Sequence, residues 1–191
     1  MRENGNNLKT DSELYEDYLS GDNSSYDILI LRHIDNLKHY VYGLLHNPQD
    51  SEDVTIEAFA RIMAKKPMIS NGKFKTYLYK TARNIAIRFH DNRLKKHCFS
   101  LEEEFEEPAT DLIIENTVIK AEDKKLLHQA LDRLEKKYKE VLWLVYFEDL
   151  SYADAAKVLG VNTKRVDHLL EKGKKALKSL LVKEGFTYEI K

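Results

Sequence analysis

The feature of the sequence that most constrains the fold is a stretch of 24 residues without glycine or proline, KFKTYLYKTARNIAIRFHDNRLKK, at residues 73–96. Apolar side chains recur in it at steps of three and four residues: Phe74, Leu78, Ala82, Ile85 and Phe89. This spacing places all of them on one stripe of an α-helix. The stretch therefore predicts a long helix that buries one face against other helices.

Glycine and proline are scarce along the whole chain, with 7 Gly and 3 Pro among 191 residues, and they mark the expected helix ends. Gly21 separates two predicted helices, and the second of them stops before Pro48, which suits the first position of a third helix. The third helix is expected to end near Pro67, where a loop leads into the long helix. Residues 1–97 are therefore predicted to form a four-helix domain.

Residues 117–191 are predicted to form a second small helical domain, and no segment alternates long enough to suggest a strand. Its four helical segments are NTVIKAEDKKLLHQALDRL, EKKYKEVLWLVYFE, SYADAAKVL and NTKRVDHLLEKGKKALKSLLVKE. Between the domains, residues 98–116 are rich in glutamate and contain Pro108, which is typical of a flexible linker. The expected fold class is all-α, with two small helical domains joined by an acidic linker.

Charge is strongly segregated along the chain, although the formal net charge is only −1. Between Arg61 and Lys96 there are eleven Lys and Arg residues and one acid, whereas residues 97–116 hold seven acids and neither Lys nor Arg. Between Thr163 and Lys183, seven Lys and Arg residues stand against two acids. Two basic blocks separated by an acidic spacer predict two separate contacts with a polyanion.

The stretch LSYADAAKVLGVNTKRVDHLLEKGKKAL, residues 150–177, has the pattern of a helix-turn-helix. Ser151 suits the start of a slim helix, Gly160 can take the positive φ that ends it, and Asn162 can cap the next helix. A helix-turn-helix places the first turn of its second helix in the DNA major groove. An ordinary helix pair with solvated lysines is the alternative interpretation. The candidate DNA contacts are Thr163, Lys164, Arg165, His168 and, for phosphates, Lys172.

The first basic block interleaves aromatic and cationic side chains on a face of the long helix beside its apolar stripe. Aromatic rings can stack on unpaired bases at about 1–3 kcal/mol each, while cations hold the backbone. The loop MISNGK, residues 68–73, suits a pocket around a base that has left the stack. Tyrosines at the edge of a core are the alternative interpretation. The candidates for binding an unpaired strand are Asn71, Lys73, Tyr77, Lys80, Asn84 and Arg88.

Asp50, Asp53 and Glu57 are spaced so that they share one face of the third helix. A metal site would need Glu-x-x-His pairs from other helices, and acid–base catalysis would need a convergent cleft. A solvated face or a site for a basic protein partner is favoured over both. The sequence shows no metal-ligand spacing, phosphate-binding glycine loop or nucleophile motif, so no metal, cofactor or enzymatic activity is expected.

The single cysteine, Cys98, excludes a disulfide framework and favours a reducing compartment. Residues 1–17 contain no apolar core of the signal-peptide type. No run reaches the roughly 18 apolar residues of a membrane-spanning helix. We therefore expect a cytoplasmic protein without membrane insertion.

Three further patterns stand in order along the chain. They are NPQDSEDVTIEAFARI, with acids before an aromatic residue; GKFKTYLYKTARNIAIRFHDNR, with a Tyr-Leu pair and Ala-Arg-Asn; and LDRLEKKYKEVLWLVYFEDLSYADAAKVLGVNTKRVDHLLEKGKKALKSLL, with a leucine-rich helix before the helix-turn-helix. They resemble, respectively, region 2.2, regions 2.3 and 2.4, and region 4 of the extracytoplasmic-function (ECF) class of bacterial RNA polymerase sigma factors, in the sigma-70 family. The resemblance extends along nearly the full chain.

The resemblance implies a dissociable subunit that binds core RNA polymerase and directs promoter-specific transcription initiation. By similarity, the face at 50–57 would dock on the clamp helices of the largest polymerase subunit, and the flap of the second subunit would be a further contact. The candidates at 71–88 would melt and read the −10 element, with Asn84 near a captured base. Those at 163–172 would read the −35 element as duplex, and the acidic linker would thread a cationic channel. An anti-sigma factor is also implied as a candidate partner.

The sequence departs from the family pattern at a few of these positions. Tyr77 stands where Trp is frequent, which is a mild change. Asp167 and Leu169 stand where Lys or Arg is common, so the −35 half lacks two cations of the family pattern.

Two other interpretations predict different behaviour. A stand-alone helix-turn-helix transcriptional regulator would bind a palindromic operator without polymerase. A helical protein-interaction module or enzyme with merely soluble lysine faces would show no salt-sensitive DNA affinity. The sigma-factor interpretation predicts that the free domains are poorly organised, and that the isolated chain binds promoters weakly until the polymerase fixes their spacing.

Overall fold

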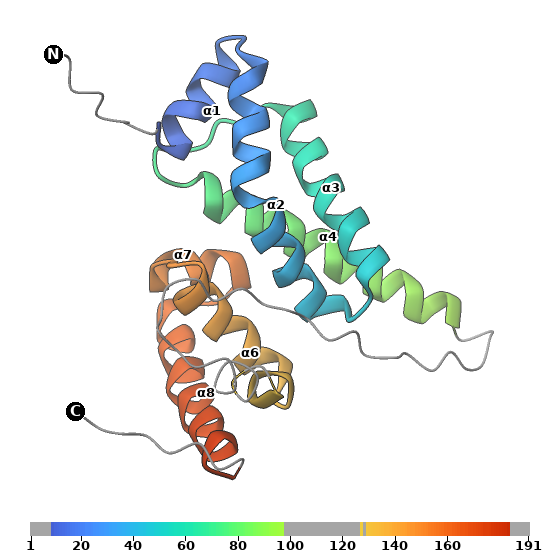
Figure 1. Ribbon diagram of the computed structural model, residues 1–191, viewed down its shortest axis with the longest axis vertical. Helices are drawn as coiled ribbons and strands as arrows, with labels where there is room; N and C mark the ends of the chain where they lie inside the picture. The colour runs from blue at the N-terminus through green and yellow to red at the C-terminus, as the bar shows by residue number, and fades with distance from the viewer. Residues whose placement is uncertain (1–8, 98–126, 128, 184–191) are drawn as a thin grey trace, which may run out of the picture.

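The computed structural model describes residues 9–97, 127 and 129–183, and every regular element within them is helical (Figure 1). This confirms the all-α fold class expected from the sequence. No described helix combines the length and the apolar character needed to cross a membrane.

The helices form an N-terminal and a C-terminal domain, as the sequence predicts (Figure 1). The predicted linker, residues 98–116, lies largely outside the described residues. The limits 1–97 and 117–191 stay predictions.

The N-terminal domain contains α1 (Asp11–Leu19), α2 (Asn23–Leu45), α3 (Pro48–Lys65) and α4 (Phe74–His97). α2 and α3 pack along each other, and α4 packs across both (Figure 1). Local chemistry sets the start of α3 as expected, because Asn47 accepts the Asp50 N–H at 2.9 Å and Pro48 takes the first position.

α4 has two buried faces. The stripe predicted from the sequence lies in the core, with four members at most 3% exposed and the last partly buried: Phe74, Leu78, Ala82, Ile85 and Phe89. On a second face, Tyr79 is completely buried, and its ring centroid lies 5.2 Å from that of Tyr40 in α2. The tyrosine is therefore a core residue and not part of a base-binding surface.

The C-terminal domain contains α6 (Lys136–Leu142), the π-helical turn η1 (Trp143–Phe147), α7 (Tyr152–Leu159) and α8 (Thr163–Lys183). The sequence predicts one helix over 135–148, but the structure widens its end into the π turn. There the Glu148 N–H bonds to the carbonyl of Trp143, five residues back, at 3.1 Å. The wider turn brings the Glu148 carboxylate to 3.2 Å from the indole Nε1 of Trp143, which would lie on another face of a regular α-helix.

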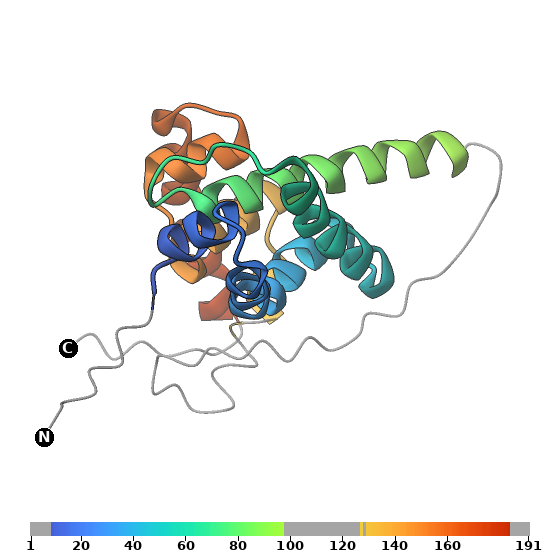
Figure 2. The ribbon, with the colours of Figure 1, turned by 90° about the horizontal axis from the view of Figure 1, so that it is seen from above.

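The two domains lie against each other, through contacts of α4 with α7 and of α2 with α6. Figure 2 shows the first turns of α4 beside the C-terminal domain and its last turns projecting away from it. Buried apolar side chains of both domains form one continuous cluster. From the sequence we expected domains without a fixed arrangement, so this packing is a difference from expectation.

Candidate nucleic-acid interface

The loop between α3 and α4 is anchored at both ends by α1. The Tyr15 hydroxyl donates to the carbonyl of Pro67 at 2.8 Å, and the N–H of Gly72 donates to Ser12 Oγ at 2.6 Å. Gly72 has φ 70°, a conformation that favours glycine. Between the anchors, Met68 is 94% exposed. The loop therefore has a fixed backbone and presents an apolar side chain to solvent.

The candidates for an unpaired strand adjoin this loop on one side of α4. Asn71 is exposed in the turn, and Lys80, Asn84 and Arg88 are exposed at four-residue steps along the helix. Tyr77 is half-buried, with its ring against the core. A hollow of about 210 Å³ between loop and helix is lined by residues that include Met68, Ser70, Lys73, Tyr77 and Lys80. Of these candidates the structure brings Tyr77 and Lys80 to the hollow, whereas Asn71, Asn84 and Arg88 are not among its lining residues.

Lys73, the remaining candidate, is paired with the other domain. Its Nζ lies 2.8 Å from Asp154 Oδ2 in α7, and Lys157 of the same helix lines the same hollow. Burial raises the pKa of the Asp154 carboxyl, but the hydrogen bonds from Lys73 and Ser151 outweigh burial and hold the pKa below its ordinary value. Asp154 is therefore ionised at neutral pH, and in this conformation its charge competes with any phosphate for Lys73.

α7 and α8 form the helix-turn-helix that the sequence predicts. Ser151 accepts the N–H of Asp154 at 3.1 Å at the start of α7, and Gly160 ends this helix with φ 70°. Asn162 then caps α8 by accepting the N–H of Arg165 at 2.8 Å. The caps fix a tight connection, so that α8 starts directly after α7 ends.

The predicted contacts at the start of α8 share one exposed surface. Val166, Leu169 and Leu170 face inward and are buried. Asp167 also lies on the exposed side, which leaves the surface basic but not uniformly so. All five candidates are exposed: Thr163, Lys164, Arg165, His168 and Lys172.

The acidic face of α3 is mixed in character. Asp53 is exposed and Asp50 is half-buried at the helix start. Glu57 already has a partner on its own helix, since Arg61 Nε lies 2.9 Å from its Oε1. Ile56 between them is 53% exposed, so the face presents an apolar side chain beside its carboxylates. Among the described residues, no group of three or more potential metal ligands occurs.

Two family models match the chain, one for Sigma-70 region 2 over residues 29–95 and one for Sigma-70 region 4 over residues 124–177. The chain belongs to the sigma-70 family. The first match contains α3, the loop and most of α2 and α4, and the second contains α7 and most of α8, which form the helix-turn-helix. The N-terminal domain of this sigma factor is therefore its region 2 domain, and the C-terminal domain is its region 4 domain.

Curated relatives of this sigma factor carry ECF names. It is 27% identical over 166 residues to the ECF RNA polymerase sigma factor SigE of Mycolicibacterium smegmatis, which covers 84% of this chain and 63% of the relative. It is 26% identical over 172 residues to the ECF RNA polymerase sigma factor SigW of Bacillus subtilis, covering 84% of this chain and 91% of the relative. The chain thus spans less than two thirds of SigE but most of SigW. The predicted ECF class is confirmed, and the sigma-factor interpretation is favoured over the stand-alone regulator.

Solved structures show the same fold. The sigma factor RpoE of Bartonella quintana, in complex with the anti-sigma factor NepR, has a TM-score of 0.66 at 20% identity, covering 82% of this chain and 96% of that chain. CnrH, in complex with the cytosolic domain of CnrY, has a TM-score of 0.61 at 20% identity, covering 90% of this chain and 96% of that chain.

Sequence reasoning missed the polar residues between the two domains of the sigma factor. Lys75, Arg83, Glu140, Glu148 and Asp154 make ion pairs across the domain boundary. The available signal was Glu148, which directly follows the apolar run LWLVYF, because a charge beside a buried segment needs a partner.

Proposed function

We propose that this sigma factor binds bacterial core RNA polymerase and directs it to promoters, with region 2 acting on the −10 element and region 4 on the −35 element. The observation that carries the proposal is a pair of separate, exposed basic surfaces, one along α4 and one at the start of α8. The names of the relatives, which are RNA polymerase sigma factors, support the same partners.

Region 2 would capture one strand of the −10 element after the duplex opens. The Tyr77 ring, half-buried and therefore rigid, offers a stacking edge worth about 1–3 kcal/mol per base. Lys80 and Arg88 would hold the phosphates on either side, while Asn71 and Lys73 would contact the strand from the loop. Asn84 carries both a donor and an acceptor, which suits it to hydrogen-bond the edge of a flipped base.

Region 4 would read the −35 element as intact duplex. The first turn of α8 would enter the major groove, where Arg165 can bond two acceptors of a guanine, and Thr163, Lys164 and His168 would contact neighbouring groups. Lys172, one turn beyond His168, would meet a phosphate and position the domain.

The acidic face of α3 would dock on the clamp helices of the largest polymerase subunit, and the flap of the second subunit would be a further contact. Asp50, Asp53 and Glu57 would supply charge to a basic partner, with Ile56 adding apolar area at the centre. Because Glu57 is paired with Arg61, docking would replace Arg61 as its partner by a basic residue of the polymerase.

We further expect the sigma factor to work in the cytoplasm, where polymerase and DNA are found, and to have no catalytic activity of its own. An anti-sigma factor is a candidate partner, since the Bartonella RpoE was solved with one. The acidic segment 98–116 would run through a cationic channel of the polymerase.

The test is run-off transcription with purified core polymerase on fragmented host DNA, with and without this chain. New transcripts that require the chain are expected. The double variant Asn84→Ala/Arg88→Ala should bind core polymerase normally but fail to open the promoter in permanganate footprinting. The double variant Asn36→Ala/Lys38→Ala, at exposed positions on α2, is the control and should open it. Absence of chain-dependent transcripts would rule the proposal out.

A further inference from the structure

The contact between the two domains is joined by three ion pairs, each linking a cation of region 2 to a carboxylate of region 4. The pairs, with their N–O distances, are Lys73–Asp154 at 2.8 Å, Lys75–Glu148 at 2.9 Å and Arg83–Glu140 at 2.7 Å. The carboxylate side chains are at most 9% exposed, whereas the cations are 21–41% exposed. The carboxylates are therefore built into region 4, and region 2 supplies their counter-charges.

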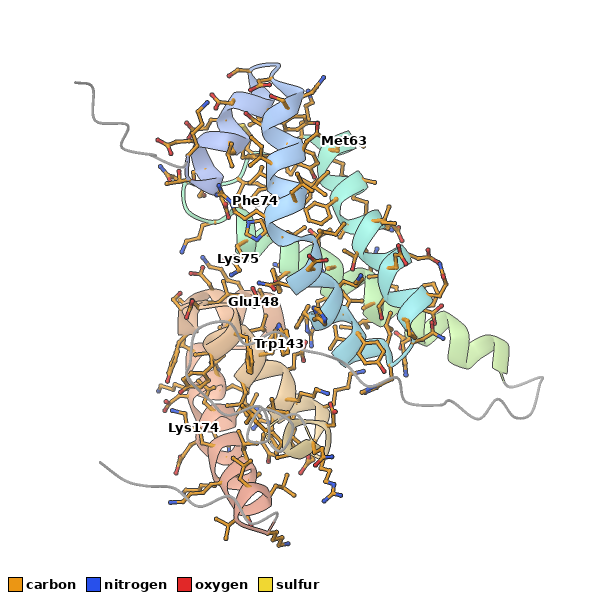
Figure 3. All side chains as sticks on the ribbon, viewed as in Figure 1. Met63, Phe74, Lys75, Trp143, Glu148 and Lys174 are labelled. Carbon is orange, nitrogen blue, oxygen red and sulfur yellow. The ribbon has the colours of Figure 1, made fainter. Side chains whose placement is uncertain are left out.

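Glu148 is the most completely buried of the three acids, at 1% exposed. The π turn holds it over Trp143, and Lys75 reaches it from α4, also donating to its backbone carbonyl at 2.8 Å. Figure 3 shows Lys75 extending from α4 toward Glu148, with Trp143 beyond it. Burial raises the pKa of Tyr79 well above its ordinary value, and the nearby Glu148 carboxylate adds to this effect. The negative charge of the buried Glu148 carboxylate therefore needs the positive charge of Lys75 to compensate it.

Glu140 makes the second part of the contact. Its Oε1 accepts from both Arg83 Nε at 2.7 Å and the Tyr40 hydroxyl at 2.9 Å, so it joins α6 to α4 and α2 together. Next to it, Lys136 Nζ donates to the carbonyl of Leu44 at 2.6 Å, near the end of α2. These bonds fix the relative orientation of the two domains and not only their proximity.

We propose that the three ion pairs form a latch that holds the free sigma factor closed, in which carboxylates of region 4 occupy cations beside the −10 surface of α4. The inference rests on the proposed function, because the −10 and −35 positions lie about 25 base pairs, or roughly 85 Å of duplex, apart. A chain whose α4 touches α7 cannot reach both. In the closed state the start of α8 stays exposed, and so do Lys80, Asn84 and Arg88 of α4. Among the candidate DNA contacts the latch therefore occupies Lys73, together with its neighbouring cations Lys75 and Arg83.

Two variants from opposite sides of the boundary test the latch in the full-length free chain. Glu148→Gln keeps an acceptor for Trp143 but removes the charge, and Lys75→Glu places like charges together. Both should raise the radius of gyration in X-ray scattering. Both should also shift the emission of Trp143, the single tryptophan, to longer wavelength, because it lines a cavity shared with α2. Glu148→Gln should bind a mixed-sequence single-stranded oligonucleotide about threefold to tenfold more tightly, because its α4 cations are released.

Lys65→Glu is the matched control. It makes the same charge change as Lys75→Glu, but at an exposed position of α3, and it should leave the radius of gyration and the Trp143 emission unchanged. Circular dichroism checks that each variant keeps its helix content. If both latch variants are folded and keep the wild-type radius and emission, the latch does not exist. A wild-type chain that fails to bind core polymerase would instead remove the proposed function, because the scattering and emission measurements do not involve polymerase.

Discussion

At the scale of single residues, Asp11 illustrates how one carboxylate joins two helices. It is the first residue of α1, and its oxygens lie 2.6 Å from Arg32 Nη1 and 2.6 Å from Nε2 of the buried His33 in α2. Burial raises the pKa of Asp11, but the hydrogen bonds from His33 and Arg32 outweigh burial and lower it overall. The ionised form is therefore the one that stabilises the fold.

The lowered pKa of Asp11 predicts a specific acid sensitivity. Stabilisation by this group is complete above its unfolded pKa of about 4 and is lost as the pH falls through the lower, folded value. Asp11→Asn should reduce the free energy of unfolding at pH 7 by about 1.5–3 kcal/mol. In urea titrations it should lose less stability than the wild type between pH 5 and pH 3. Asp27→Asn, at an exposed position of α2, is the control, and equal acid losses in all three proteins would contradict the assignment.

Two cations on α8 are expected to contribute differently to DNA binding. Arg165 lies in the first turn, where side chains meet base edges, so Arg165→Ala should cost about 1–3 kcal/mol on the preferred −35 duplex and relax specificity at one position. Lys172 lies farther along, so Lys172→Ala should weaken binding to all sequences and lower the salt slope by about one. Salt-dependent anisotropy with polymerase holoenzyme distinguishes them, and identical profiles would refute the division of roles.

At the scale of the elements, two helical glycines differ in how closely neighbouring side chains approach them. A Cβ on Gly173 of α8 would lie 3.3 Å from Tyr138 Cβ and 3.3 Å from Leu142 Cδ1 in α6, whereas one on Gly43 of α2 would meet only Lys139 Cε at 3.8 Å. Gly173→Val should therefore destabilise region 4 by about 1–3 kcal/mol through overpacking. Gly43→Ala should stabilise α2 by about 0.5–1 kcal/mol. Thermal unfolding checks both, and a stabilised Gly173→Val would show that the helices can move apart.

The helices were predictable from the sequence because their determinants are local. The α4 stripe from Phe74, the cap at Asn47 and the Gly160 turn each depend on residues a few positions apart. The exposed faces of α4 and α8 were predictable for the same reason, because helical spacing alone decides which side chains share a face. The π turn and the Lys75–Glu148 pair were not predictable, because one is a change of helical period without a breaker residue, and the other joins positions 73 residues apart.

At the scale of the whole molecule, the two domains share an apolar cluster, but charged and hydrogen-bonded groups fix their orientation. Apolar contact alone tolerates many arrangements, because it is not directional. Partly exposed cations, in contrast, remain open to competition from phosphates and salt. Such a boundary fits the proposed latch, because its polar contacts define one arrangement of the domains and its cations remain accessible to competing anions.

Salt should therefore change the shape of the free chain. The Debye length falls from about 10 Å at 0.1 M to about 3 Å at 1 M, which weakens pairs whose cations reach solvent. Sodium chloride is the suitable salt, because it strengthens apolar contacts less than sulfate does. Between about 0.1 M and 1 M, the radius of gyration of the wild-type chain should rise while its helix content stays constant. Glu148→Gln, already open, should show a much smaller rise. A wild-type radius that does not respond to salt would mean that the apolar cluster holds the domains together and the charges do not.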